Sequence, residues 1–133
     1  MPHTAVKSPN VFDRVAPKSQ ATLTPAGRML HISGQTPTSK EGFTVAVGDV
    51  KLQTEKVFEN IRHIVESAGG SISDVCRIVI YVIDRSDLPI IMGVRERMLP
   101  KPYPATTSVV VSGLGLRDWL VEIEATAVLS ATQ

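Results

Sequence analysis

Cysteine, aromatic side chains, net charge and long apolar runs are all scarce in this sequence. Its 133 residues include one cysteine, one tryptophan, two tyrosines and three phenylalanines. The lone cysteine, Cys76, cannot form an internal disulfide, and the first residues hold no apolar run that could act as a secretory signal, so we expect a cytoplasmic, reducing environment. The longest apolar run, residues 78–83, is far shorter than the roughly 18 residues that cross a bilayer.

The charge balance argues against a polyanionic partner. Lysine and arginine together number 14 and aspartate and glutamate 13, which leaves a formal net charge of +1. Proteins that hold a phosphate backbone or an anionic membrane usually carry clustered basic residues, and single-stranded RNA also needs aromatic rings to stack on. We therefore expect no nucleic acid and no membrane as a partner.

Length and composition predict one compact unit. The chain is shorter than the roughly 150 residues of a typical domain, and its 43% hydrophobic and 20% charged residues are ordinary for a globular protein. Residues 1–19 carry three prolines and little pattern, so we expect a partly attached N-terminal arm there. Residues 20–130 are expected to form a single domain.

Turn residues and apolar spacing predict the first elements of this domain. Residues 21–24 and 29–33 are predicted as two strands, joined as a hairpin by the turn at Pro25-Ala26-Gly27. A helix that Gly69-Gly70 ends is predicted next, from the spacing of Val57, Phe58, Ile61, Ile64, Val65 and Ala68. Residues 75–83 are dense in β-branched side chains and predict a central strand covered on both faces.

The second half of the chain continues the same alternation of elements. A helix is predicted to start at Asp84 or Ser86, to end at Pro100, and to place these side chains on one face: Leu88, Ile91, Met92, Arg95, Met98 and Leu99. Residues 106–112 and 120–129 are predicted as strands. The order ββαβαββ predicts an α+β fold, a two-layer sandwich with both helices on one face of a mixed, mostly antiparallel sheet.

The last strand alternates between two unlike faces. One face is apolar and is predicted to lie under the helices: Val121, Ile123, Ala125, Ala127 and Leu129. The other mixes carboxylates with apolar side chains: Leu120, Glu122, Glu124, Thr126 and Val128. The preceding strand likewise puts Thr106 and Ser108 on one side. Because so short a chain has no third layer for such a half-polar face, we expect a second subunit to cover it.

Short segments spread over residues 17–129 recur in a characteristic order and spacing. They are Pro17-Lys18-Ser19-Gln20-Ala21, the run from Leu30 to Pro37, Gln53-Thr54, Phe58-Glu59-Asn60-Ile61, Ala68-Gly69-Gly70, Asp74-Val75, Pro104-Ala105 and Val121-Glu122-Ile123-Glu124-Ala125. Together they resemble the RidA/YjgF family, whose members are also described as reactive-intermediate deaminases or L-PSP endoribonucleases.

The resemblance implies a chorismate-mutase-like fold and a homotrimer, with clefts between subunits where a small molecule binds. It also implies an activity, the hydrolysis of enamines and imines such as 2-aminoacrylate to a 2-oxo acid and ammonia, with no metal and no cofactor. In active members an arginine directly follows the Pro-Ala segment of the strand and binds the substrate carboxylate. Thr106 stands at that position here.

Other positions of the family site are carried over residue by residue. Glu122 falls where the family has the carboxylate that orients the attacking water, and Gly34 and Gln35 fall where the backbone approaches the ligand. Ser108 occupies a position where many relatives have cysteine. Lys18 replaces an aromatic residue, and one hypothesis is that it supplies the positive charge that Thr106 lacks.

Each of these residues also has a plainer interpretation. Glu122 could be a solvated strand carboxylate, or could form a structural ion pair with Arg77. Lys18 could be a surface residue on the arm. Cys76 is expected to be a small core residue and not a nucleophile, and the histidines share no spacing that would indicate a zinc site.

Two other functions compete with the deaminase. In one, a family member without the arginine carries out changed chemistry, as a tautomerase or a hydrolase on a substrate that has no carboxylate. In the other, the trimer binds a ligand without turnover. A ribonuclease ranks last, because neither charge nor aromatic content favours RNA.

Overall fold

The computed structural model describes residues 3–131. A four-stranded sheet has the order β3-β6-β4-β5, and a separate two-stranded sheet pairs β1 with β2. The strands are β1 Thr4–Val6, β2 Ala21–Leu23, β3 Arg28–Gln35, β4 Val75–Val82, β5 Ala105–Val110 and β6 Val121–Leu129. The α-helices are α1 Val50–Ser67 and α2 Leu88–Met98, and short 3-10 turns, Ile72–Asp74 and Arg85–Asp87, precede β4 and α2.

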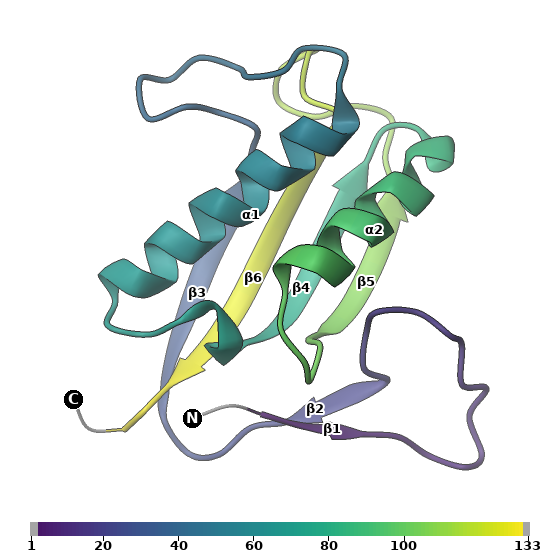
Figure 1. The fold of residues 1–133 in the computed structure, drawn as a ribbon, viewed down its shortest axis with the longest axis vertical. Coiled ribbons are helices and arrows are strands. Elements are labelled where there is room, and N and C mark those ends of the chain that lie inside the picture. The colour runs from purple at the N-terminus through teal and green to yellow at the C-terminus, as the bar shows by residue number, and fades with distance from the viewer. Residues whose placement is uncertain (1–2, 132–133) are drawn as a thin grey trace.

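Both helices lie over the same face of the four-stranded sheet (Figure 1). The β3–β6 and β6–β4 pairs are antiparallel and the β4–β5 pair is parallel. The core lies between the two layers, where Phe58 and Ile61 of α1 meet Ile80 and Ile123 of the sheet, all four almost fully buried. The predicted α+β sandwich is therefore confirmed. No helix within residues 3–131 is long and apolar enough to cross a membrane.

The predicted hairpin of the first two strands is wrong in its pairing. Both strands exist, but β2 pairs antiparallel with β1, and β3 pairs antiparallel with β6. The strand in residues 4–6, which the sequence pattern did not indicate, supplies the partner of β2, and Thr22 fastens the pair to the sheet by donating to the Cys76 carbonyl at 2.9 Å. The proposed boundary between arm and domain at residue 19 stays a prediction.

Local chemistry explains where the helices begin and end. Asp49 caps α1 by accepting a hydrogen bond from the Leu52 amide at 3.0 Å. After Ala68 the chain turns through Gly69 at a φ of 91°, a left-handed conformation that glycine adopts without strain. Asp84 caps the turn before α2 by accepting from the Ser86 amide at 2.9 Å. The predicted C-terminal ends are confirmed, before Gly69-Gly70 for α1 and before Pro100 for α2. The predicted start of the second helix is early, because Asp84 caps the 3-10 turn and α2 itself begins at Leu88.

The two faces of the sheet differ as the alternation of the last strand predicted. Val121, Ile123, Ala125, Ala127 and Leu129 are all buried under the helices. The opposite face, here called the open face, has no helix over it among residues 3–131. On β4 this face carries exposed Arg77, buried Val79 and half-buried Tyr81, so within one chain the second face of β4 is only partly covered.

Candidate functional site

Glu122 lies on the open face, where the register of β6 and β4 places it opposite Tyr81. The side chain is half-buried. Within residues 3–131 its carboxylate accepts no hydrogen bond and forms no ion pair, whereas the neighbouring Glu124 accepts a hydrogen bond from the Tyr81 hydroxyl at 2.5 Å. Of the two carboxylates on this face, Glu122 is therefore the one that is open to a ligand or a water molecule.

Gly34 lies against the Glu122 carboxylate at an irregularity in β3. The register with β6 shifts between Ile32 and Gln35, which is the mark of a β-bulge. A Cβ atom on Gly34 would lie 2.9 Å from the Cδ of Glu122 and would collide with one carboxylate oxygen. Because glycine has no side chain, the Glu122 carboxylate can lie directly against the backbone of Gly34.

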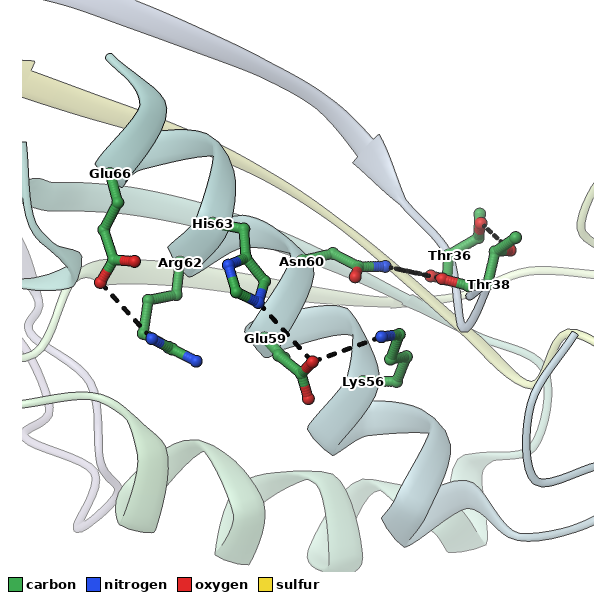
Figure 2. A network of polar contacts seen from close by, with 8 residues as sticks. All are labelled: Thr36, Thr38, Lys56, Glu59, Asn60, Arg62, His63 and Glu66. Carbon is green, nitrogen blue, oxygen red and sulfur yellow. Dashed lines mark hydrogen bonds and ion pairs between the residues drawn. The ribbon is translucent and has the colours of Figure 1, made fainter. Parts of the chain in front are cut away.

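The loop that follows Gly34 is fastened to α1. Asn60 donates from Nδ2 to the carbonyl oxygens of Thr36 and Thr38, at 3.2 and 3.1 Å (Figure 2). The ion pairs of Glu59 with Lys56 and His63 on α1 are partly solvent-exposed and add little to stability. Asn60 thus fixes the position of the bulge that carries Gly34.

Gln35 points away from Glu122. Its register partner is Ile123, which faces the helices, and its side chain lines a pocket beside Asn60 and His63 of α1. The side-chain amide of Gln35 donates from Nε2 to the Ser33 carbonyl at 3.1 Å. Within one chain, Gln35 therefore contributes its backbone and not its side chain to the neighbourhood of Gly34 and Glu122.

Thr106, Ser108 and Lys18 come together at a second place. Thr106 and Ser108 pair in register with Ile78 and Ile80 of β4, so they lie on the helix-covered side of the edge strand β5. They line a pocket of about 400 Å³ together with Lys18. The loop between β1 and β2, which contains Lys18, is joined to the start of β5 by a bridge between Ser19 and Ala105, and Figure 1 shows this loop near β5. Lys18 is exposed, and Thr106 donates from its hydroxyl to the Pro104 carbonyl at 3.1 Å.

The expected residues therefore form two groups on opposite faces of the sheet. Glu122 and Gly34 lie on the open face, and Thr106, Ser108 and Lys18 lie on the helix side. The expectation that the polar residues of β5 and β6 share one uncovered face is wrong. The reason is the parallel pairing of β5 with β4, whose register sequence alternation does not reveal.

Arg95 is a charged residue of the pocket that sequence reasoning overlooked. It lies on α2, is only 3% exposed, and lines the same pocket as Thr106 and Ser108. The signal was present in the sequence, because the apolar spacing of the second helix places this arginine among Ile91, Met92 and Met98. A charged residue inside an apolar stripe must find a partner or a ligand.

The contacts of Arg77, Tyr81 and Cys76 decide between a structural and a functional role for each of these residues. Arg77 is exposed and forms no ion pair with Glu122 or Glu124. The hydrogen bond to Glu124 raises the pKa of Tyr81, which keeps its hydroxyl protonated. Burial raises the pKa of the Cys76 thiol, which donates to the Thr126 carbonyl at 3.4 Å, so Cys76 is a core residue. Among residues 3–131, no three potential ligand side chains are grouped to hold a metal ion.

Comparison with known proteins identifies relatives over most of the chain. The model of the family described as endoribonuclease L-PSP matches residues 10–129. A RutC family protein of Pyrococcus horikoshii is 39% identical over 85% of this chain and 87% of that protein. The 3-aminoacrylate deaminase RutC of Acinetobacter baylyi is 38% identical over 78% of this chain and 82% of that protein. A 2-iminobutanoate/2-iminopropanoate deaminase of Dermatophagoides farinae is 27% identical over 96% and 98%.

Solved structures share the fold over almost the whole chain. The Rid family protein YyfB from Yersinia pestis superposes with a TM-score of 0.88 at 30% identity, covering 97% of this chain and all of that one. RidA from an Antarctic Psychrobacter superposes with a TM-score of 0.71 at 33% identity, covering 95% and 99%. The chain is thus similar to Rid proteins in both sequence and fold.

Proposed function

The chain belongs to the endoribonuclease L-PSP family, and from that membership we propose that it hydrolyses small reactive enamines or imines to a carbonyl compound and ammonia. Two relatives that bear deaminase names support this activity. The observation that carries the proposal is the half-buried Glu122 carboxylate, which has no partner within residues 3–131 and lies directly against Gly34. With Cys76 as its only cysteine, we place the protein in the cytoplasm.

The chemistry needs one carboxylate and one water molecule, without a cofactor. An enamine first takes a proton on carbon to become an imine. Glu122 then removes a proton from water as the water oxygen bonds to the imine carbon, and the nitrogen receives a proton. The tetrahedral amino alcohol that results breaks its C–N bond, releases ammonia and leaves the carbonyl compound. A carboxylate positioned by Gly34 and free of competing hydrogen bonds suits this proton transfer.

We assign the remaining residues to binding. Thr106 and Ser108 offer hydroxyl groups, Lys18 supplies positive charge, and the backbone at Gly34 and Gln35 shapes the floor beside Glu122. These groups lie on two faces of one chain, so a single ligand cannot touch all of them in the same copy. We therefore propose a homotrimer in which the open face of one subunit meets the edge strand β5 of the next, with the ligand between them.

Replacement of Glu122 tests the activity against a matched neighbour. We expect Glu122→Gln to lower kcat/KM for freshly generated 2-aminoacrylate by about a hundredfold or more, because the amide cannot accept a proton. The control is Glu124→Gln, which alters the other carboxylate of the open face, two residues along β6. This carboxylate already accepts a hydrogen bond from Tyr81, so the change should alter kcat/KM less than about threefold. Ammonia and the 2-oxo acid are measured together in each reaction, against the rate without enzyme. Equal losses in both variants, or no turnover by the unaltered protein, would contradict the proposal.

A second candidate function rests on Thr106. A neutral hydroxyl at this position favours a substrate without a carboxylate, acted on by a hydrolase or a tautomerase in the same cleft, or a ligand that is bound without turnover. Neutral imines and 2-aminoacrylate, compared in the same ammonia assay, separate a hydrolase of neutral substrates from the deaminase. A tautomerase releases no ammonia and is detected by the change in the absorbance of its substrate. A ligand that binds but releases no product would indicate the binding protein.

A further inference from the structure

Arg95 is a buried arginine without a partner. It lies on α2 between apolar neighbours, is 3% exposed, and its Nε has no hydrogen-bond partner. Within residues 3–131 its guanidinium forms no ion pair and no hydrogen bond. A buried cation destabilises a fold unless an anion or a hydrogen-bond acceptor reaches it. Such a residue in a cavity wall therefore indicates a ligand.

The pocket that Arg95 lines has the character of an anion site. Arg14 and Lys18 line it as well, and among the described residues no acidic side chain does. Thr106 and Ser108 add hydroxyl groups on one side, and Ile91 with its neighbours on α2 forms an apolar wall on the other. The volume of about 400 Å³ accommodates a small ligand. Its complement is a small carboxylate with a short hydrocarbon tail.

Arg95 differs from Lys18 in how strongly it can hold such an anion. The ammonium of Lys18 is exposed to water, which screens it. The guanidinium of Arg95 is desolvated and planar and can donate two parallel hydrogen bonds to a carboxylate. Burial lowers the pKa of Arg95 from its ordinary value, but an arginine remains protonated at neutral pH.

We propose that Arg95 of α2 binds the substrate carboxylate, in place of the strand arginine whose position Thr106 occupies. This inference rests on the proposed function for the identity of the substrate, but not for the existence of the anion site. It assigns the specificity for 2-imino acids to a helix instead of to strand β5. It also makes Lys18 an auxiliary charge at the rim of the pocket.

The test measures binding of a stable carboxylate and needs no turnover. The probe is 2-oxobutanoate, titrated calorimetrically into the unaltered protein and the variants Arg95→Met, Arg95→Lys and Lys18→Met. We expect Arg95→Met to weaken binding about tenfold to a hundredfold, because a charge-assisted pair of hydrogen bonds is lost. Lys18→Met removes an exposed charge of the same pocket, so it should also weaken binding, but by less than Arg95→Met does. The neutral 2-oxobutanamide should bind the unaltered protein and Arg95→Met equally.

A relocated arginine provides a rescue. In the double variant Arg95→Met/Thr106→Arg the guanidinium returns to strand β5, and we expect it to recover most of the affinity for 2-oxobutanoate. Methionine matches the length of the arginine stem and removes an uncompensated charge, so Arg95→Met should fold. If it does not, Arg95→Lys decides, since an ammonium lacks the fork geometry and should still weaken binding about tenfold.

Three results would overturn the assignment. One is unchanged affinity for 2-oxobutanoate in Arg95→Met, or in Arg95→Lys where Arg95→Met does not fold. Another is an equal loss of affinity for the neutral 2-oxobutanamide in the same variant, which would show that the effect does not depend on the carboxylate. The third is a change in the mass in solution of Arg95→Met, which would show that a carboxylate of a neighbouring subunit is the partner of Arg95. Loss of carboxylate binding in a protein that releases no ammonia would instead support the anion site and refute the deaminase.

Discussion

At the scale of single residues, the pairing of Gly34 with Glu122 shows how a missing side chain can position a functional one. No group among residues 3–131 donates a hydrogen bond to Glu122, so its position depends on the space around it. That space exists because β3 bulges and carries glycine where it passes β6. The carboxylate is thereby held near backbone without being neutralised by a cation.

Gly34→Ala follows from this contact. The added methyl group would collide with the far end of the Glu122 side chain, which can rotate away, so we expect a stability loss below about 1 kcal/mol. Because the carboxylate moves, kcat/KM for 2-aminoacrylate should fall at least tenfold. Urea unfolding and the ammonia assay measure the two effects.

Gly113→Ala is the control for that variant, because nothing lies within 4 Å of a Cβ at this position. It should change neither quantity appreciably. A Gly34→Ala protein with full activity would show that Glu122 is not the group that orients the water. A variant that unfolds instead would show that the bulge tolerates no side chain.

At the scale of elements, Gln53 holds α1 to the segment that leads into β6. It is fully buried, and its Nε2 lies within hydrogen-bond distance of three carbonyls, of Val45 and Ala46 at 3.3 Å and of Asp118 at 2.9 Å. Its Oε1 accepts from the Leu120 amide at 2.9 Å. The helix thereby fixes the start of the strand that carries Glu122.

Gln53→Leu tests this connection. Leucine has a similar volume but cannot pair with the buried amide and carbonyl groups, so we expect a loss of about 2–4 kcal/mol in the free energy of unfolding. The exposed neighbouring position provides the comparison, and Leu52→Ala should cost less than about 1 kcal/mol. Both are measured by urea denaturation. A Gln53→Leu protein as stable as Leu52→Ala would show that water or a shift of the loop replaces these bonds.

The elements themselves could largely be predicted from the sequence, because each depends on local spacing. The apolar steps from Val57 to Val65 predict α1, and alternation predicts which side chains of β6 are buried, apart from Val128, which is buried on the other face. The pairing of strands could not be predicted, because it depends on contacts between distant segments. The β1–β2 pair and the parallel register of Thr106 with Ile78 are the two examples.

The candidate site was only partly accessible to sequence reasoning for the same reason. The resemblance pointed to Glu122 and Gly34, which the structure places in contact. It could not point to Arg95, since the role of this arginine depends on α2 packing beside β5 so that both line one pocket. The apolar spacing placed Arg95 on the same helix face as Ile91 and Met98, but it did not indicate what that face packs against.

At the scale of the whole molecule, one chain provides two halves of a site that do not meet. The Glu122 half lies on the open face, where Met29 and Val109 are 59% and 38% exposed and offer apolar area to another surface. The Arg95 half lies beside β5, an edge strand whose outer side is bridged only at Ala105, among the described residues. Exposed edges and apolar faces of this kind are where protein subunits meet.

Mixed oligomers test whether the halves meet between subunits. Glu122→Gln and Arg95→Met damage different halves, so each homotrimer alone should be nearly inactive. In a cyclic trimer formed by coexpressing both chains, every mixed trimer contains one junction with both halves intact, and random mixing should restore about a quarter of the activity on 2-aminoacrylate. Light scattering of the same samples measures the mass. Activity that stays at the sum of the two variants, or a stable monomer near the chain mass of 14.4 kDa, would exclude a shared site and return both halves to a single chain.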